Sequence, residues 1–394
     1  MQILKILFII IQVGIGIHFI LPVFLYLISL VKKKETLNEN INVEYDYAII
    51  VTAYEQTTLL PAVINSILKL NYENFMVYVV ADKCDITGLN FNSEKVILLR
   101  PEETLAGNTK SHFYAINRFV RPHELLTIID SDNLVDQEYL NELNVYFKSG
   151  FSAVQGVRAA KNLNTIYACL DAASDIFYRF IDRKLLFSAG SSAALSGSGM
   201  AFTTSLYQEC LGDKIIEGAG FDKVLQLELQ KRDLRVAFAE KAVVFDEKTS
   251  KSDQLVKQRS RWMFTWFKYA GMGLQLIFKG FYNLSWNQLI YGIFFVRPPL
   301  FLLGLLSTSF LIIDIIFIPG MIMFWIVAFA LFIVTFLTAL NYFKAPKKIY
   351  RSLIGIPVFV FYQVLSLLKS KNANKISVAT EHFQDIDNKD ITKS

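Results

Sequence analysis

Two aspartates in the stretch IIDSDN, Asp130 and Asp132, stand two positions apart directly after the apolar run LLTII. In a tight turn, this spacing lets one carboxylate meet a divalent cation while the other contacts a neighbouring ligand. Oxygen ligands of this kind suit Mg²⁺ or Mn²⁺ beside phosphate groups. A turn that Asp130 caps, with Asp132 solvated, explains the same pair. On its own, the pair leaves both interpretations open.

Further acidic and glycine positions extend this first set. Asp82 ends the apolar run VYVVA, and Asp222 opens an amphipathic helical pattern, although each taken alone also fits a helix or turn cap. In the stretch LSGSGMAF, Gly197 and Gly199 flank a serine, which would let a ligand approach the backbone closely. A plain turn explains these glycines as well.

The stretch VKQRSRWMFTW carries three unlike side chains with helical spacing. Gln258, Arg261 and Trp262 are at positions i, i+3 and i+4, so they share one face of a helix. Glutamine can hydrogen-bond, arginine can hold a phosphate through two bonds, and tryptophan can stack on a sugar ring. The alternative is an interfacial helix, in which Trp266 and Lys268 help to anchor the chain to lipid headgroups.

Strand-like and helical stretches alternate from Tyr47 onward. The runs YAIIVTA, MVYVVAD, KVILL and LLTIID have strand character, and LLPAVINSILKL between the first two is helical. This alternation predicts an α/β fold with a mostly parallel sheet. Ligands of open α/β sheets lie beyond the carboxyl ends of the strands, so we expect Asp82 and Asp130 to line one crevice.

The composition combines membrane segments with a globular domain. Of the 394 residues, 53% are hydrophobic, and the apolar excess lies in residues 3–31 and 286–368. At about 1.5 Å per helical residue, either region is long enough to cross an apolar layer of roughly 30 Å. The first is too long for a signal-peptide core and is followed by Lys32, Lys33 and Lys34. This pattern predicts a retained anchor with the next domain in the cytoplasm.

Charge and cysteine content argue against several other classes. Three scattered cysteines, Cys84, Cys169 and Cys210, predict neither a disulfide framework nor a metal cluster and favour a reducing compartment. The net charge of +5 is modest, and the sequence carries no nucleic-acid signature. A transporter is disfavoured because the apolar segments contain neither a pair of broken helices nor an interior acid cluster.

These patterns predict four regions of the chain. They are a transmembrane anchor at 1–34, a single cytoplasmic domain with interfacial helices at 45–283, a membrane region at 284–370 and a polar tail at 371–394. Within the membrane region we expect two crossings and a third, doubtful segment, at 289–318, 321–343 and 352–368.

Two charged residues, Arg297 and Asp314, fall within the first of these apolar segments. On a continuous helix they would be about 25 Å apart and near its ends. We therefore expect both side chains to snorkel toward water rather than to form an ion pathway.

Taken in chain order, Asp82, the DSD and GSG stretches, Asp222 and the Q-x-x-R-W pattern resemble the family-2 glycosyltransferases. More narrowly, they resemble the membrane-embedded branch that contains cellulose, chitin and hyaluronan synthases and the bacterial poly-N-acetylglucosamine synthases. The motifs cover about Tyr45 to Tyr269, and the flanking apolar segments fit the branch in arrangement. The stretch VATEH near the end looks like the short Thr-containing motif of that branch.

The resemblance implies a GT-A type fold, a nucleotide-sugar donor that is usually a UDP-sugar, Mg or Mn as cofactor, and inverting transfer to a growing β-linked polysaccharide. By position, Asp82 would contact the nucleoside, Asp130 the nucleotide sugar, and Asp132 the metal, while Asp222 would be the general base. A metal offsets the charge that develops on the leaving diphosphate, and a carboxylate near the acceptor hydroxyl takes its proton.

The resemblance also assigns the region where the acceptor meets the diphosphate. Its residues would be Gly197, Gly199, Gln258, Arg261 and Trp262. In addition, Lys110 lies where this branch usually carries a basic residue near the nucleotide, and Arg158 follows the next predicted strand. Since exposed lysines and arginines are usually only solvated, that interpretation stays open for Lys110 and Arg158.

The chain departs from the family pattern in two places. Phe221 precedes Asp222 where the family usually has a glutamate, and the first acidic motif is ADKCD rather than a paired acid. If Asp222 were misaligned, Glu217 would be the nearest other acid upstream that could act as the base.

Three functions remain open from the sequence. The first is a polysaccharide-forming glycosyltransferase of the bacterial inner membrane, multi-pass, with a cytoplasmic catalytic domain. The second is transfer of a single sugar to a lipid-linked acceptor, and the third is a catalytically inactive membrane scaffold of a synthase complex. Expected partners are the donor, a glycan or lipid-linked acceptor, membrane lipid, and further copies or synthase subunits, without nucleic acid.

Overall fold

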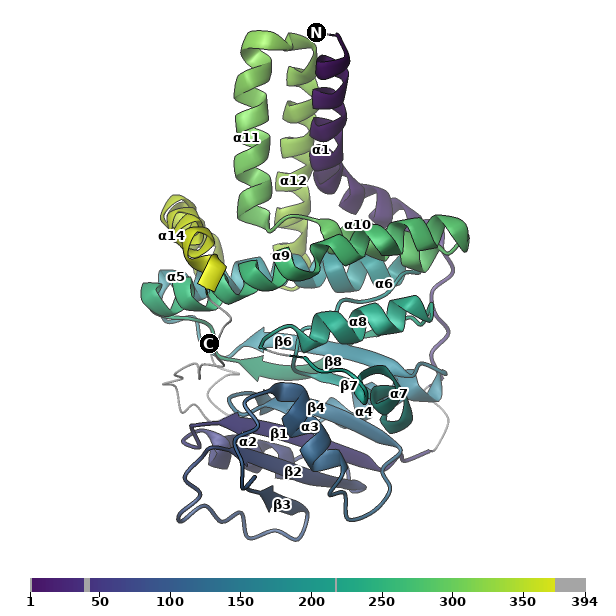
Figure 1. The fold of residues 1–394 in the computed structure, drawn as a ribbon, viewed down its shortest axis with the longest axis vertical. Coiled ribbons are helices and arrows are strands. Elements are labelled where there is room, and N and C mark those ends of the chain that lie inside the picture. Colours follow the sequence, from purple (N-terminus) through teal and green to yellow (C-terminus); the bar gives the residue numbers. More distant parts are fainter. Residues whose placement is uncertain (1, 39–42, 217, 373–394) are drawn as a thin grey trace.

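The computed structural model describes residues 2–38, 43–216 and 218–372. A sheet-based domain lies below a stalk of long helices (Figure 1). The sheet of eight strands in the described part of the chain has the order β3-β2-β1-β4-β7-β6-β8-β5. The strands are β1 (Tyr47–Tyr54), β2 (Phe75–Asp82), β3 (Val96–Leu99), β4 (Leu125–Asp130), β5 (Leu134–Val135), β6 (Ala153–Ala160), β7 (Met200–Thr203) and β8 (Ala237–Asp246).

Helices cover the sheet and form the stalk. The helices are α1 (Gln2–Val31), α2 (Leu60–Leu68), α3 (Asn108–Ile116), α4 (Tyr139–Lys148), α5 (Ile166–Tyr178), the π-helix η1 (Arg179–Leu185), α6 (Leu186–Ser188), α7 (Thr204–Leu211), α8 (Phe221–Lys231), α9 (Ser252–Tyr282), α10 (Trp286–Val296), α11 (Leu300–Phe317), η2 (Pro319–Met321), α12 (Ile322–Tyr342), α13 (Lys347–Ser352), η3 (Leu353–Gly355), α14 (Ile356–Lys369) and η4 (Ser370–Asn372).

Strand β1 lies between β2 and β4 and is parallel to both. Its register pairs Tyr54 with Asp82 of β2, and Thr52 with Asp130 of β4. Strands β1 and β2 are buried along nearly their whole length, which explains why their sequences are continuous apolar runs rather than alternating ones. The predicted α/β fold with a mostly parallel sheet is confirmed, and the register brings Asp82 and Asp130 to the same edge of it.

Strand β7 is antiparallel to both of its neighbours, β4 and β6, a feature that the sequence did not predict. The chain enters β7 through the GSG turn, where the Gly199 amide donates to the Ile128 carbonyl at 2.9 Å and the Gly156 amide donates to the Gly199 carbonyl at 2.8 Å. A Cβ atom on Gly156 would lie 2.5 Å from the Ala242 carbonyl oxygen, so only glycine permits this approach of β6 and β8.

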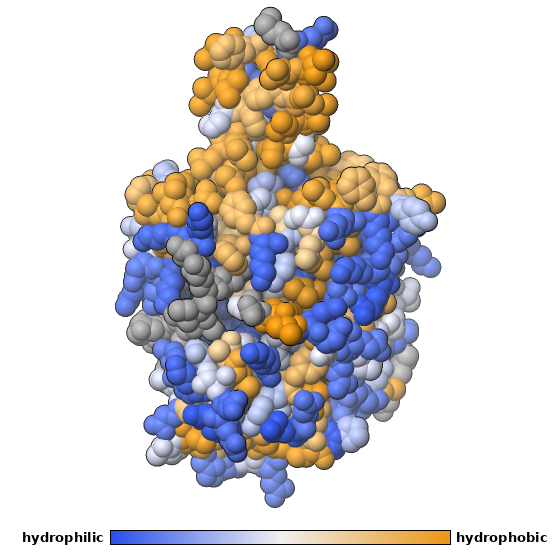
Figure 2. All heavy atoms as spheres, viewed as in Figure 1, coloured by the Kyte–Doolittle hydropathy of each residue, from blue (hydrophilic) through white to orange (hydrophobic). Residues whose placement is uncertain are grey.

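Helices α1, α11 and α12 form the stalk (Figure 1), and its surface is almost entirely apolar (Figure 2). Together with the segment 347–369, they make four described helices that are long and apolar enough to cross a membrane. The last of these breaks at η3, and α14 lies outside the stalk, packed against α9 and α5. With 14 residues, α14 is about 21 Å long, shorter than an apolar layer of roughly 30 Å.

The apolar segment expected at 289–318 is not one helix. It breaks at residues 297–299, because Pro298 and Pro299 lack the amide hydrogens that a continuing helix needs. Helix α10 instead packs closely along α9, where a Cβ on Gly280 would lie 2.5 Å from the Leu289 amide nitrogen. Arg297 therefore lies in a loop at the base of the stalk and forms an ion pair with Asp182 at 2.7 Å. The expectation that Arg297 snorkels along a helix was wrong.

Asp314 does not snorkel either. Its side chain is fully buried between the three stalk helices, where it accepts hydrogen bonds from Gln12 Nε2 at 3.0 Å and Trp325 Nε1 at 2.9 Å. Buried polar groups in an apolar layer are stable only when they find such partners. The partners of Asp314 lie on two other helices, Gln12 on α1 at the start of the chain and Trp325 on the following helix α12, so periodicity within one segment could not reveal them.

We expect Asp314→Ala to lower the thermal unfolding temperature of the full chain in detergent. The substitution removes one acceptor of Gln12 Nε2 and of Trp325 Nε1, while Trp325 Nε1 keeps Gln12 Oε1 at 3.0 Å, so we expect a loss of about 1 kcal/mol. Asp314→Asn is the matched control, since it keeps one acceptor oxygen and should retain most of the stability. Equal stability of the two variants would show that these hydrogen bonds do not hold α1 to α11 and α12.

Candidate active site

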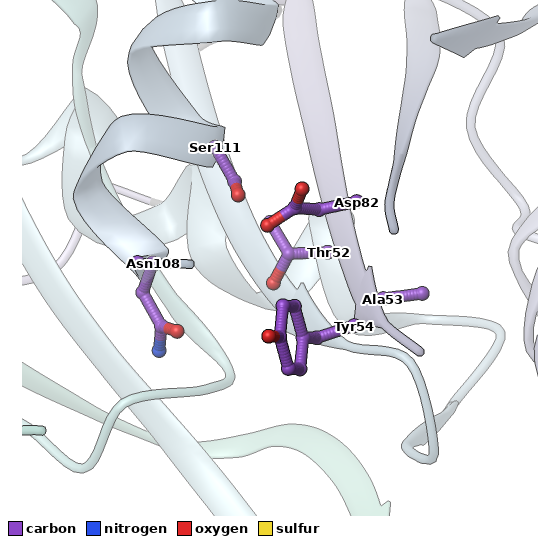
Figure 3. A pocket seen from close by; sticks show the side chains of 7 residues that line it. Thr52, Ala53, Tyr54, Asp82, Asn108 and Ser111 are labelled. Atoms are coloured by element: carbon purple, nitrogen blue, oxygen red, sulfur yellow. The ribbon is translucent and has the colours of Figure 1, made fainter. Parts of the chain in front are cut away.

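A pocket opens at the carboxyl ends of β1 and β2, beside the start of α3 (Figure 3). Side chains from the two strands and from the first turn of the helix face the same space. The lining residues are Thr52, Ala53, Tyr54, Asp82, Gly107, Asn108 and Ser111. Its place at a strand edge, next to a helix N-terminus, is the usual place for a nucleotide in an open α/β sheet.

Asp82 is held by the backbone of its own chain. Its two carboxylate oxygens accept the Leu105 amide at 2.9 Å and the Ala106 amide at 2.8 Å, and the residue is 1% exposed. The side chain thereby fixes the loop that leads into α3 and forms one wall of the pocket. Lys110, in contrast, is exposed and lies outside the lining set, so the structure does not bring it into the pocket.

The turn after β4 carries Asp130 and Asp132, and a buried serine fixes it. Ser198 Oγ accepts the Asp130 amide at 3.1 Å and donates to Asn133 Oδ1 at 2.6 Å. The flanking Gly197 and Gly199 have φ values of +86° and +65°, which favour glycine. The sequence indicated the two glycines but missed Ser198, whose partners lie on a different strand.

The oxygen ligands at this turn fit a metal ion that is coordinated partly by the protein and partly by a bound ligand. Asp132 is 8% exposed, and Asn133 Nδ2 lies 3.3 Å from its Oδ1 and 3.4 Å from Asp246 Oδ1. Within the described ranges, no three histidine, cysteine or acidic side chains are grouped to hold a metal ion by themselves. A cation at Asp132 would thus complete its shell with diphosphate oxygens and water, as Mg²⁺ commonly does in phosphate-transferring sites.

Asp222 lies in the first turn of α8 and is half-buried, with Oδ1 accepting the amide of Lys223 at 2.9 Å. The preceding Phe221 is a core residue, 5% exposed, and its ring packs edge-on against His112. Burial lowers the pKa of His112 to about 3, so this neighbour is an uncharged ring. Phe221, which stands where the family usually has a glutamate, therefore packs in the core. The alternative base, Glu217, lies outside the described residues.

The α8 turn abuts the long helix α9. A Cβ on Gly220 would lie 2.8 Å from both Thr265 and Tyr269, which follow Arg261 by one and two turns on the same face of α9. Thr265 Oγ1 also donates to the Arg261 carbonyl at 2.8 Å. Asp222 and Arg261 therefore lie on two elements that are in direct contact. Burial lowers the pKa of the Arg261 guanidinium.

The other members of the α9 motif differ in their surroundings. Gln258 Oε1 accepts a hydrogen bond from Thr249 Oγ1 at 3.2 Å, so part of its hydrogen-bonding capacity is used by the preceding loop. Trp262 is 46% exposed, and the guanidinium of Arg259 lies 4.3 Å from its ring centre. Arg259 is itself anchored by an ion pair with Asp171. The Trp262 ring is therefore packed against Arg259 on one side, and its remaining surface is accessible to solvent.

A buried ion pair, which sequence analysis missed, lies behind the DSD turn. Arg158 Nη2 is 2.7 Å from Asp246 Oδ1, and Lys248 Nζ is 2.9 Å from Asp246 Oδ2. Burial alone would raise the pKa of Asp246, but the charges of Arg158 and Lys248 outweigh it and hold this pKa well below its ordinary value. Arg158 is therefore not a solvated side chain, although its partner is Asp246 rather than a nucleotide in this structure.

The sheet topology, the acidic turn after β4 and the adjoining helices α8 and α9 define a GT-A type α/β protein. Residues 45–265, more than half of the chain, match the family described as glycosyltransferase like family 2. The chain belongs to this family and is a glycosyltransferase. The family predicted from the motifs is confirmed.

Comparison with solved structures gives one neighbour that supports this fold and a weaker likeness. The mannosyltransferase PcManGT from Pyrobaculum calidifontis, in complex with GDP-Man and Mn²⁺, is 12% identical with a TM-score of 0.55 and covers 93% of this chain and 97% of that one. TarS 1–349 of S. aureus, in complex with UDP-GlcNAc, is 15% identical with a TM-score of 0.38 and covers 76% and 91%. At these identities, the first likeness shows the fold alone. No functionally curated protein matches the sequence.

We expect Ser198→Ala to weaken metal-dependent binding of the donor nucleotide by about tenfold, because the Asp130 amide and Asn133 lose a buried partner. Calorimetry with and without Mn²⁺ measures this effect. Ser196→Ala is the matched control, since Ser196 Oγ makes only a 3.5 Å contact with the Ser198 carbonyl. Unchanged donor affinity in Ser198→Ala would show that the hydroxyl does not organise the acidic turn.

Proposed function

We propose that the chain is an inverting, metal-dependent glycosyltransferase that uses a nucleotide sugar, most simply a UDP-sugar, at the membrane surface. The observation that carries this proposal is the convergence at one sheet edge of the Asp82 pocket and the turn with Asp130 and Asp132. The neighbouring α8 and α9 supply Asp222 and Arg261. Mn²⁺ and GDP-Man in PcManGT support a divalent metal and a nucleotide-sugar donor here.

The donor would lie along the carboxyl edge of the sheet. Its nucleoside would occupy the pocket that Asp82 helps to form, and its diphosphate would extend toward Asp132. Bound Mg²⁺ or Mn²⁺ would offset the negative charge of the leaving diphosphate. Arg261 would contact the same diphosphate, because its guanidinium remains a donor to phosphate oxygens at any ordinary pH.

Asp222 would act on the acceptor. Its half-buried carboxylate accepts the amide of the neighbouring Lys223 through Oδ1, and the turn that carries it abuts the face of α9 that carries Arg261. We assign it the removal of the proton from the attacking hydroxyl, while Trp262 stacks on the acceptor sugar and Gln258 hydrogen-bonds it. A single displacement from the side opposite the diphosphate inverts the anomeric centre.

The packing of the stalk favours a lipid-linked acceptor over a polysaccharide that passes through the protein. Between α1, α11 and α12 the interior is filled by Trp325 and Asp314, both 0% exposed, and by Gln12. A glycan would need a path outside this three-helix contact, supplied by further copies or partner subunits. The polysaccharide reading therefore depends on assembly, whereas transfer to a lipid at the membrane surface needs only one chain.

The proposed location is the bacterial inner membrane with the catalytic domain in the cytoplasm. Lys32, Lys33 and Lys34 follow α1, and Lys347 and Lys348 follow α12, all on the side of the catalytic domain. Such a bias of basic residues marks the cytoplasmic side of a membrane protein.

A donor panel tests the reaction. We expect the purified full chain to release nucleotide from one UDP- or GDP-sugar when Mg²⁺ or Mn²⁺ and membrane lipid are present, and to stop when EDTA removes the metal. Asp222→Asn should lower turnover at least about 100-fold, since it removes the base. Asp213→Asn, at a side chain 77% exposed, is the matched control. Full turnover in Asp222→Asn would shift the base to Glu217, which Glu217→Gln then tests.

Product length separates the two acceptors. With a lipid-linked sugar as acceptor, we expect mass spectrometry to show a product that is heavier by one sugar unit at all reaction times. A ladder of longer products from the isolated chain would contradict single transfer and support the polysaccharide reading.

A further inference from the structure

A cluster of buried charges lies between the sheet and the base of the stalk. Its basic members are Arg158, Arg179, Arg183, Lys248 and Arg297, and its acids are Asp175, Asp182 and Asp246. We call this set the basal cluster. The side chains of Arg179, Arg183, Lys248 and Arg297 are only 5–8% exposed.

Ion pairs join the members of the basal cluster. Asp175 lies 2.9 Å from Arg179, 3.5 Å from Lys248 and 3.9 Å from Arg183. Lys248 continues to Asp246, and Arg179 donates to the Arg158 carbonyl. The basic members nevertheless outnumber the acids by five to three. Two further acids lie nearby. Asp171 is engaged with Arg259, and Asp130 of the acidic turn acts on Arg158, but with Asp130 counted the basic members are still in excess.

The arginines also keep unused donors. Arg158 Nε, Arg179 Nε, Arg183 Nη1 and Arg297 Nη1 are buried and have no hydrogen-bond acceptor among the described residues. Burial lowers the pKa of Arg183, and although Asp175 opposes this shift, the nearby Arg179 and Arg158 add to it. Buried guanidinium groups with unused donors are costly, and an anion that accepts from several of them removes this cost.

The local backbone supports a ligand site. Arg179, Asp182 and Arg183 all belong to η1, a π-helical stretch between α5 and α6. Such stretches are rare and frequently lie at functional sites. Here the π-helix concentrates two arginines and an aspartate next to the sheet.

The basal cluster joins the catalytic groups to the membrane boundary. At one end, Asp246 contacts Asn133 of the acidic turn. At the other, Arg297 stacks over Tyr178, whose hydroxyl accepts the amide of Leu300, the first residue of the membrane helix α11.

The proposed base lies near this cluster. Burial raises the pKa of Tyr291, and the negative charges of Asp182 and Asp222 raise it further, while Arg183 and Arg297 oppose the shift. The buried side chain of Tyr291 is therefore close enough to feel the charges of both the basal cluster and Asp222.

We propose that the basal cluster binds the phosphate group of a membrane-anchored lipid. The inference rests on the proposed transferase function, because a lipid-linked acceptor held there by its phosphate would extend its sugar toward Asp222. The donor diphosphate is a different ligand: its expected partner, Asp132, is not a member of the basal cluster and is linked to Asp246 of the cluster through Asn133 Nδ2. A phospholipid headgroup carries the same chemistry, and the experiment separates the two sources.

Binding of lipids to the full chain in detergent, without donor, tests this proposal. We expect polyprenyl phosphate to bind and uncharged polyprenol to bind at least about tenfold more weakly, since charge-assisted hydrogen bonds are lost. Preference for polyprenyl phosphate over phosphatidylglycerol assigns the site to an acceptor lipid, and equal binding assigns it to a headgroup. Equal affinity for polyprenol and polyprenyl phosphate overturns the proposal.

Variants locate the site. Arg183→Gln should weaken polyprenyl phosphate at least about tenfold, and Arg183→Lys less, because it keeps the charge. Arg118→Gln, on the exposed end of the α3 region, is the matched control. Donor binding at the Asp82 pocket reports whether each variant is folded. Unchanged affinity for polyprenyl phosphate in a folded Arg183→Gln chain also overturns the proposal. Because this experiment measures lipid binding and not turnover, its result can be interpreted even if the donor panel fails.

Discussion

Charge compensation under the membrane is the constraint that organises this molecule. Between the sheet and the stalk, arginines, a lysine and aspartates are removed from water, and each must find an opposite charge or lose much of its solvation free energy. Asp246 satisfies this need from β8, Asp175 from α5 and Asp182 from η1. These pairs tie the catalytic sheet, the π-helix and the loop before α11 into one unit. The placement of the sheet relative to the base of the stalk follows from them.

The acidic turn after β4 also depends on polar partners for groups that are removed from water. A turn that collects negative charge needs a scaffold, and Ser198 supplies part of it by bonding to the Asp130 amide and to Asn133. In the same way, Asp82 is neutralised by backbone amides rather than by a cation. The candidate site therefore contains carboxylates in two settings: Asp82 is held by backbone amides, and Asp132 lies beside the side chain of Asn133.

Local patterns in the sequence were enough for the fold and for part of the site. Strand-like runs and the parallel register led directly to Asp82 and Asp130 at one edge, and helical spacing predicted a shared face for Gln258 and Arg261. Contacts between distant segments were not predictable in this way. Ser198 bonds across the sheet, and Gln12 reaches Asp314 from the other end of the chain. The consecutive prolines Pro298 and Pro299 indicate a helix break, but the apolar residues on both sides of them suggested one continuous membrane helix.

The bonding of Asp82 has a consequence for base selectivity. Its two oxygens each accept one backbone amide, from Leu105 and Ala106, so about half of the acceptor capacity of this carboxylate is used in holding the loop. In the proposed donor complex, discrimination between uracil and guanine would therefore fall mainly to the other polar side chains that line the pocket, Thr52, Tyr54 and Asn108. Redesign of this enzyme toward another nucleotide should begin with those side chains and leave Asp82 in place.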